Sequence, residues 1–314
     1  MRALHVPTAG EQPQLGELPT PEPTEGTVLI RVKAAGLNPI DNAVAAGFLA
    51  QMGLPHEYPL VIGRDAAGVV EAVGAGVDHV AVGDEVLGHV LLAPPISAGT
   101  LAEHAVLPAA TVTPKPAGLD FTTAAALPLA GAAAVQAVDA IDPQPGQSVL
   151  VSGASGGVGS YAIQLLAARG VTVIATGSDT ARLTALGAST VVDRAAGPVA
   201  EQVRAAYPDG VDALVNLFGY TADDVPLAAV RRGGKVSSLA MAPDQDTATA
   251  AGLTLSPIMA APLAEVTKPL AEQAAAGTLK IDVGSVIGLE QATDALAAIG
   301  AGNAKGKTVV TIEH

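Results

Sequence analysis

The alternation of apolar and polar residues changes character part-way along the chain. Residues 27–35 alternate as a half-buried strand does, and shorter segments of the same kind follow at 67–73, 84–90 and 100–107. Glycine, proline or aspartate residues lie between them. Many short strands joined by turns predict an antiparallel, barrel-like domain.

A different pattern begins after Pro114. An alanine-rich helical stretch leads to a turn at 143–146, and a helix is expected from about 158 to 169. Apolar strands alternate with helical segments over this region, at 148–152, 171–176, 211–215 and 235–240. Apolar strands that alternate with helices predict a parallel, doubly wound sheet.

The last part of the chain is too short for a third domain. After about residue 261, a helix, the segment 280–287, a helix at 289–299 and a strand at 307–312 are expected to return to the first domain. The sequence therefore predicts an α/β chain in which one domain is inserted into the other. The predicted domains are 1–120 with 262–314, and 121–261.

The longest charge-free run, 121–138, is only about long enough to span a membrane. It contains Pro128, Gly131 and Gln136 and is mostly alanine. We interpret it as a buried helix. The start of the chain shows no apolar segment of the signal-peptide type. We therefore expect a cytoplasmic protein without a membrane partner.

Composition and charge exclude several classes of protein. The 314 residues contain no cysteine, and 30 acidic against 16 basic side chains give a formal net charge of −14. The lack of cysteine excludes disulfide scaffolds, thiol catalysis and every cysteine-based zinc site. An acidic surface repels phosphate backbones, so we expect no nucleic-acid partner. The six histidines show no ligand spacing, and we predict no metal site.

A glycine-rich turn carries the clearest chemistry. Strand 148–152 runs into 153–159 (GASGGVG) and then into an apolar-periodic helix. In this context glycines let the backbone approach a pyrophosphate, and the N–H groups at the helix start hold the anion. The alternative is a glycine-rich turn without a ligand. The residues expected to bind the dinucleotide are Ser155, Gly156, Gly157 and Val158.

The residues after strand 171–176 bear on the choice between NAD and NADP. Ser178 and Arg182 provide a hydroxyl and a guanidinium that can both face a 2′-phosphate, which favours NADPH over NADH. Asp179 complicates this interpretation, although aspartate at this place commonly caps the following helix. The alternative for Arg182 is a solvated charge on that helix.

Several ordered motifs extend over nearly the whole chain. Besides the glycine turn they are 36–41 (GLNPID), 59–71 (PLVIGRDAAGVVE), 82–86 (VGDEV), 99–103 (GTLAE), 126–131 (ALPLAG) and 306–310 (GKTVV). The chain thereby resembles the medium-chain dehydrogenase/reductase superfamily, and within it the zinc-independent quinone oxidoreductase group. The resemblance implies a GroES-like β-barrel catalytic domain with an inserted Rossmann domain, and a homodimer.

The resemblance also implies which substrates can react. Asn38 stands where zinc-dependent relatives have a zinc-binding cysteine, Arg64 where they have a zinc-binding histidine, and Ile40 where a serine or threonine relays a proton. Without Lewis-acid polarisation, the remaining chemistry is hydride transfer from NADPH to an electron-poor acceptor. Such an acceptor is a quinone or an alkene conjugated to a carbonyl.

The same comparison implies the site residues. Asn38 and Arg64 are the candidate donors to a developing oxyanion or enolate. The alternatives are a turn residue before Pro39 and an ion pair with a nearby acid. Asn38 is also expected near the nicotinamide, together with Leu217, Phe218, Leu239, Ala240 and Met241.

This chain departs from its relatives at a few positions. Arg194 replaces a tyrosine near the adenosine, where it could stack on adenine or add a cation near the phosphate. Phe48 and Ala133 replace a tyrosine and a threonine. Together with His89 they are expected to line a roomy, mostly aliphatic acceptor pocket.

Two other functions are compatible with the sequence. One is an enoyl-thioester reductase of the polyketide-tailoring type, although the acidic chain shows no basic cluster for a phosphopantetheine arm. The other is a non-catalytic NADPH-binding protein like the lens crystallins that share this fold, because a fold does not determine a function.

Overall fold

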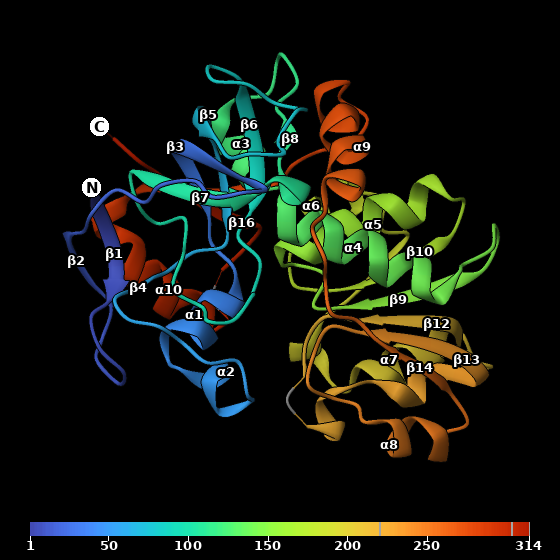
Figure 1. Cartoon of the computed structure of the whole chain (residues 1–314). Helices are drawn as coiled ribbons and strands as arrows, with labels where there is room; N and C mark the ends of the chain where they lie inside the picture. The colour runs from blue at the N-terminus through green and yellow to red at the C-terminus, as the bar shows by residue number, and fades with distance from the viewer. Residues whose placement is uncertain (220, 303, 314) are drawn as a thin grey trace. The chain divides into compact units, whose positions relative to one another are not determined.

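The computed structural model describes residues 1–219, 221–302 and 304–313. The chain forms two compact units (Figure 1), and each is described separately here. The first unit consists of Met1–Leu129 and Pro262–His314, and the second of Ala130–Ala261. The first junction thus lies beyond the sequence-predicted position at 120/121. The short helix α3 (Phe121–Ala125) packs on strands of the first unit and therefore belongs to it.

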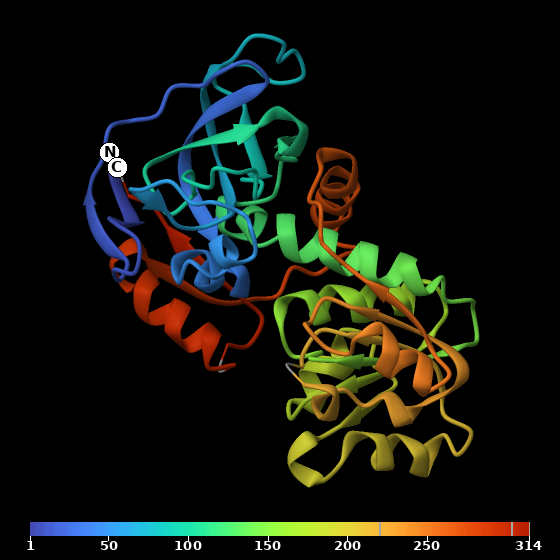
Figure 2. The ribbon, with the colours of Figure 1, turned by 60° about the horizontal axis from the view of Figure 1, so that its bottom comes forward.

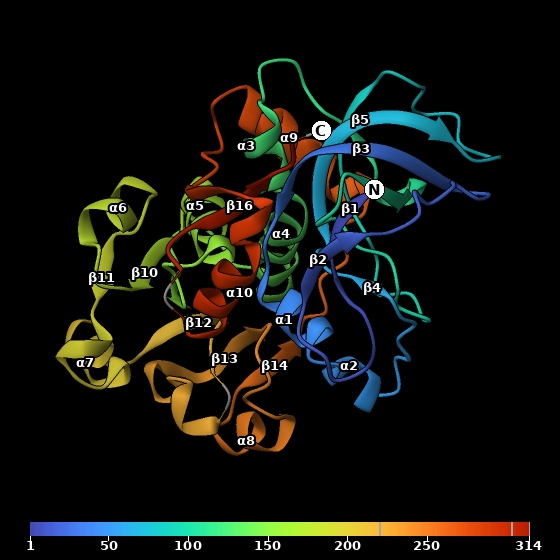
Figure 3. The ribbon, with the colours of Figure 1, turned by 90° about the vertical axis from the view of Figure 1, so that its left-hand side faces the viewer.

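The first unit is built around a mixed sheet. Its strand order is β15-β16-β3-β5-β6-β8, with β7 paired to β3, and all pairs except β15–β16 are antiparallel. Figure 3 shows the long strands β3 and β5 side by side. The strands are β3 (Thr27–Gly36), β5 (Asp65–Val73), β6 (Glu85–His89), β7 (His104–Pro108), β8 (Thr113–Pro114), β15 (Val283–Gly288) and β16 (Lys307–Thr311).

Other elements complete the first unit. A small antiparallel sheet has the order β2-β1-β4, from Gln14–Glu17, Arg2–Val6 and Leu60–Val61. The helix α10 (Ala292–Gly300) lies beside α1 (Pro39–Ala45), as Figure 2 shows. The remaining helices are α2 (Phe48–Gln51) and α9 (Ala264–Ala275).

The alternating pattern of 27–35 has the predicted consequence. Val28, Ile30 and Val32 on β3 are fully buried and belong to one apolar core with residues of β5, β6 and β7. Burial of such side chains stabilises the unit by about 1.5–3 kcal/mol each. The segment predicted as a strand at 100–107 is extended in the sheet only from His104 onward.

The second unit is built on a parallel sheet, as predicted, and this sheet has six strands. Its order is β11-β10-β9-β12-β13-β14, so β10 and β12 flank β9 on opposite sides. The strands are β9 (Ser148–Ser152), β10 (Thr172–Thr176), β11 (Thr190–Val192), β12 (Val211–Asn216), β13 (Val230–Ser238) and β14 (Thr254–Pro257). The helices are α4 (Pro128–Ile141), α5 (Gly157–Ala168), α6 (Thr180–Ala185), α7 (Val199–Ala206) and α8 (Gln245–Ala250). The order reverses at β9, the position at which such sheets bind ligands.

The charge-free run at 121–138 was predicted as one helix, and this prediction is wrong. The structure has two helices, because α3 ends at Ala125 and α4 begins at Pro128. Proline has no N–H to donate and suits the first position of a helix, so the chain restarts there. In the part of the chain that the structure describes, no helix is long and apolar enough to cross a membrane.

Candidate functional site

The glycine turn of the second unit lies between β9 and α5. Gly153 has φ +78°, and its N–H donates to Thr176 Oγ1 at 2.9 Å, which ties the turn to the neighbouring strand β10. A Cβ on Gly159 would lie 2.5 Å from the Cα of Ala154, so only glycine lets α5 start this close to the turn. The helix begins at Gly157 and directs its first N–H groups out of its N-terminus. N–H groups in this arrangement can bind an anion, and the expectation that they bind the dinucleotide stays a prediction.

Arg182 is held against the glycine turn. Its Nη1 and Nη2 atoms both donate to the carbonyl oxygen of Ser155, at 3.2 Å each. The carboxylate of Asp179 accepts the backbone N–H of Arg182 at 3.1 Å, so it caps α6 as the sequence suggested. Ser178 is exposed, two residues after the end of β10. The turn and the end of β10 thus bring a guanidinium and a hydroxyl to the same sheet edge.

The remaining predicted nucleotide residues of this unit follow neighbouring strands. Leu217 and Phe218 come directly after β12, and a Cβ on Gly153 would lie 3.2 and 3.3 Å from their Cβ atoms. The guanidinium carbon of Arg194 lies 4.4 Å from the centre of the Phe218 ring. Leu239, Ala240 and Met241 follow β13, and the side chain of Met241 is exposed. Together with the residues of the glycine turn, Ser178 and Arg182, the predicted nucleotide residues of this unit therefore follow the carboxyl ends of β9, β10, β11, β12 and β13.

A second polar centre lies inside the first unit. Asn38, Asp65, His89 and Lys307 are all buried. Asp65 Oδ2 accepts from Asn38 Nδ2 at 2.9 Å, and its Oδ1 lies 2.7 Å from His89 Nδ1. Lys307 Nζ donates to Asn38 Oδ1 at 2.7 Å. Together these four side chains form the polar cluster.

Both amide hydrogens of Asn38 have acceptors within the first unit. Besides Asp65, Asn38 Nδ2 contacts the carbonyl oxygen of Gly36 at 3.3 Å. Burial lowers the pKa of Lys307, and the negative charge of Asp65 partly opposes this effect. The polar cluster thus places a carboxylate, an ammonium group and an imidazole within a few ångströms of each other.

Asp41 and Arg64 lie next to the polar cluster. Asp41 Oδ2 accepts the backbone N–H of Asn38 at 2.8 Å. Burial raises the pKa of Asp41 to about 7, against the opposing influence of Arg64. Burial likewise lowers the pKa of the fully buried Arg64, and the nearby acids oppose this shift.

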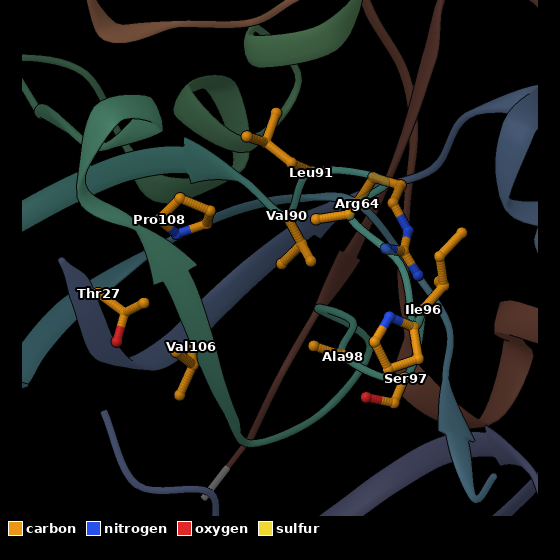
Figure 4. A pocket seen from close by; sticks show the side chains of 11 residues that line it. Thr27, Arg64, Val90, Leu91, Ile96, Ser97, Ala98, Val106 and Pro108 are labelled. Carbon is orange, nitrogen blue, oxygen red and sulfur yellow. The ribbon is translucent and has the colours of Figure 1, made fainter. Parts of the chain in front are cut away.

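Arg64 also lines a cavity of about 160 Å³ in the first unit. In Figure 4 its guanidinium lies on the side of Ile96, whereas Thr27, Val106 and Pro108 lie on the opposite side. Most of the lining side chains are aliphatic. The expectation that Arg64 donates to the acceptor stays a prediction.

The residues predicted for the acceptor pocket are distributed over both units. His89 ends β6 and is buried, and Phe48 begins α2 with 44% of its surface exposed. Ala133 is buried in the part of α4 that belongs to the second unit. Their joint role stays a prediction.

The side chains of Asn38 and Arg64 do not suit a zinc ion. Arg64 is a cation, Asn38 offers an amide that is already paired, and the sequence contains no cysteine. Among the described residues, no group of three or more His, Cys, Asp or Glu side chains could hold a metal ion.

Sequence reasoning left Asp65, Lys307 and Thr176 without a role. Asp65 and Lys307 stand inside quoted motifs, IGRDAAG and GKTVV, but no local pattern shows that they meet. Thr176 ends a strand beside the turn, and its hydroxyl could have been found from that position.

Residues 24–117 match the family model described as alcohol dehydrogenase GroES-like domain, and residues 186–310 match the model described as zinc-binding dehydrogenase. A mitochondrial NAD(P)H oxidoreductase of Danio rerio is 30% identical over 327 aligned positions, which cover 91% of this chain and 83% of that protein. The chain belongs to the medium-chain dehydrogenase/reductase superfamily. Within this superfamily it falls in the quinone oxidoreductase group, which confirms the resemblance and the fold.

Two solved structures of the superfamily cover this chain almost completely. The quinone oxidoreductase of Coxiella burnetii has a TM-score of 0.88 and 29% identity, and covers 100% of this chain and 99% of its own. A mycobacterial protein solved in complex with NADPH has a TM-score of 0.84 and 27% identity, over 99% of this chain and 100% of its own. Because the Danio rerio relative is mitochondrial, the cytoplasmic location stays a prediction, as does the homodimer.

Proposed function

We propose that this chain is a zinc-independent, NADPH-dependent reductase that transfers a hydride to a quinone or an α,β-unsaturated carbonyl. The observation that carries the proposal is Arg182, whose guanidinium lies on the Ser155 carbonyl beside the glycine turn. A cation at this place favours a 2′-phosphate, and a relative of the same fold binds NADPH.

In this proposal the second unit binds the cofactor. The N-terminus of α5 holds the pyrophosphate, and Ser178 with Arg182 holds the 2′-phosphate. When bound, the cofactor supplies the hydride. The residues after β12 and β13 lie at the same edge of the sheet and line the nicotinamide side.

The first unit contributes the polar cluster. Asn38 donates to the developing oxyanion, which requires it to give up one of its two present hydrogen bonds. The bond to Gly36 is the longer, at 3.3 Å against 2.9 Å to Asp65. Lys307 and Asp65 act as positioning residues, because they hold the amide in one orientation.

The hydrogen-bond donors of the site indicate which class of substrate accepts the hydride. Neither Asn38 nor Arg64 can polarise an unactivated carbonyl as zinc does, so the acceptor must already be electron-poor. Quinones and conjugated enones meet this condition. An enoyl thioester also does, but the net charge of −14 offers no support for an anionic carrier arm.

The test is acceptor-dependent oxidation of NADPH by the purified chain. We expect turnover with 9,10-phenanthrenequinone or with an alkyl enone, and the reduced product in equal amount to the NADPH consumed. Tight NADPH binding without turnover across a panel of quinones, enones and enoyl thioesters would contradict the proposal and favour a non-catalytic protein. Turnover with enoyl thioesters alone would favour the polyketide-tailoring alternative.

A further inference from the structure

His89 and Asp65 face each other across two neighbouring strands. Asp65 begins β5, His89 ends β6, and the two residues are paired in the antiparallel register. Because paired residues project their side chains to the same face of a sheet, the imidazole and the carboxylate meet, and His89 Nδ1 lies 2.7 Å from Asp65 Oδ1. The backbone of His89 is held as well, since Thr111 Oγ1 donates to its carbonyl oxygen at 2.6 Å. The strand register thus fixes this pair within the first unit.

The other contacts of Asp65 indicate which ring nitrogen of His89 carries a proton. Asp65 Oδ2 accepts from the amide of Asn38 at 2.9 Å, and its Oδ1 accepts from the backbone N–H of Leu129 at 3.1 Å. A carboxylate surrounded by donors accepts from the imidazole too, so Nδ1 of His89 is the donor of this bond. An imidazole bound in this way turns its other nitrogen, Nε2, away from the carboxylate.

Nε2 of His89 is left available for chemistry. It has no hydrogen-bond partner among the described residues, and it is not one of the polar atoms that the protein seals from solvent. The side chain of His89 keeps 5% of its surface exposed, whereas that of Asp65 keeps none. A histidine that a buried carboxylate holds by Nδ1, with Nε2 accessible, has the arrangement of a general acid or base.

The proposed reduction of a conjugated carbonyl needs such an acid. Hydride addition to the β-carbon leaves an enolate, which becomes the product only when its α-carbon takes a proton. Protonation at carbon is slow and gains from a positioned acid, whereas the oxygens of a reduced quinone take protons readily from water. Asp65 binds both Asn38, the proposed oxyanion donor, and His89. The two oxygens of one carboxylate thereby hold the amide and the acid together.

We propose that protonated His89 delivers the proton of Nε2 to the α-carbon of an α,β-unsaturated carbonyl, and that this class of acceptor, rather than quinones, is the substrate. The inference rests on the proposed reductase function. The β-carbon takes the hydride, and the electron pair of the C=C bond ends in the new C–H bond at the α-carbon. The N–H bond of Nε2 breaks, its electron pair stays on the imidazole, and the ring regains a proton from water. The alkene is reduced and NADPH oxidised, with Asp65 as the positioning residue of His89.

The first test uses 3-methyl-3-penten-2-one, whose α-carbon becomes stereogenic when it is protonated. The wild type should oxidise NADPH with this enone and give mainly one enantiomer of the saturated ketone, measured by chiral gas chromatography. His89→Asn keeps an amide N–H for Asp65 but has no acid, so kcat should fall about a hundredfold or more and the product should approach a racemate. With 9,10-phenanthrenequinone the same variant should lose much less activity, which also shows that it is folded.

The matched control is His104→Asn. His104 forms a second histidine–carboxylate pair in the first unit, with its Nε2 at 3.0 Å from Oε2 of Glu71. This variant should keep both the rate and the enantiomer ratio of the wild type. Should His89→Asn fail to fold, His89→Gln replaces it with the same expectation, because the amide is no acid either.

A measurement without cofactor or substrate tests the geometry of the pair. NMR of the chain with isotope-labelled histidine should show a proton on Nδ1 of His89 that exchanges slowly with solvent, because buried Asp65 holds it. A His89 ring without a proton on Nδ1 would overturn the inference.

The kinetic outcomes separate this inference from the proposed function. It is overturned if the His89 variant keeps the rate and the enantiomer ratio of the wild type with the enone, or if its enone and quinone activities fall by the same factor. Wild-type turnover with quinones but not with enones would also overturn it and leave the proposed function standing. No turnover with any acceptor would contradict the proposed function itself, and this inference with it.

Discussion

The ammonium group of Lys307 donates a hydrogen bond of 2.7 Å to Oδ1 of Asn38, deep inside the first unit. Nζ of Lys307 also donates to the carbonyl oxygen of Leu37 and lies 3.7 Å from Asp65 Oδ2. A residue near the end of the chain thereby fixes the orientation of an amide near its start. In the proposed reaction this amide faces the developing oxyanion.

Replacing Lys307 by methionine should destabilise the protein by about 3 kcal/mol or more. The variant leaves Asp65 buried without its cation and leaves Oδ1 of Asn38 without a donor. Chemical denaturation measures this loss. The exposed Lys305 serves as the matched control, and Lys305→Met should change the free energy of unfolding by no more than about 0.5 kcal/mol. Equal effects of the two substitutions would show that the polar cluster does not hold the unit together.

Asp41 should make stability depend on pH. Its pKa is about 7 in the folded chain, against an ordinary value of 3.8, so the folded state keeps a proton that the unfolded chain releases. The stabilisation is complete below the ordinary value and is lost as the pH rises to about 7, by an amount on the order of 4 kcal/mol.

The Asp41→Asn variant has no such proton to lose. The free energy of unfolding of both proteins is measured by denaturation at a series of pH values. Between pH 4 and pH 7 that of the variant should rise relative to that of the wild type, because only the wild type loses stability through this group. The matched control is substitution of the exposed Asp78 by asparagine. A difference for Asp41→Asn that does not change with pH would contradict the raised pKa.

Two glycines of the turn should separate folding from cofactor binding. Gly159→Ala places a Cβ 2.5 Å from the backbone of Ala154, so it should lower the free energy of unfolding by about 1–3 kcal/mol. Gly156→Ala meets only the Gly153 carbonyl at 3.5 Å, an ordinary contact, and has a negative φ. It should therefore fold normally and weaken NADPH binding, because the methyl group faces the pyrophosphate. Unchanged NADPH affinity in Gly156→Ala would show that the pyrophosphate does not bind at this turn.

Arg194 should contribute to binding through the adenine rather than the phosphate. One face of its guanidinium lies on Phe218, which leaves the other face for a second ring. Loss of a stacked cation at an exposed site is worth about 0.5–1 kcal/mol. Fluorescence titration of Arg194→Met should accordingly show NADPH and NADH weakened alike, by about two- to fivefold. Weakening of NADPH alone would place Arg194 at the 2′-phosphate.

The parts of the fold that depend on local pattern could be predicted from the sequence. Strand 148–152, the glycine turn and the start of α5 are contiguous, so apolar periodicity and glycine spacing suffice to place them. The break at Pro128 follows from an equally local rule, because proline lacks the N–H that a continuous helix would need there. The apolar run taken by itself does not show this break.

The polar cluster could not be predicted in the same way. Asn38 caps the N-terminus of α1, and the other members lie on β5, β6 and β16. Asn38 and Lys307 are 269 positions apart in the sequence. No sequence period reports which buried polar side chains will meet once the sheet has formed. The sequence resemblance identified Asn38, but the partners that occupy both of its amide hydrogens emerge only from the packing of the strands.

The comparison of NADPH with NADH in the wild type and in Arg182→Gln tests the account most directly. We expect the wild type to reduce 9,10-phenanthrenequinone with a higher kcat/KM for NADPH than for NADH, and Arg182→Gln to lose most of this preference through a higher KM for NADPH. The control Arg169→Gln removes an exposed cation that pairs with Asp139 and should keep the preference. No acceptor-dependent oxidation of NADPH, or a preference for NADPH that survives in Arg182→Gln, would contradict the account.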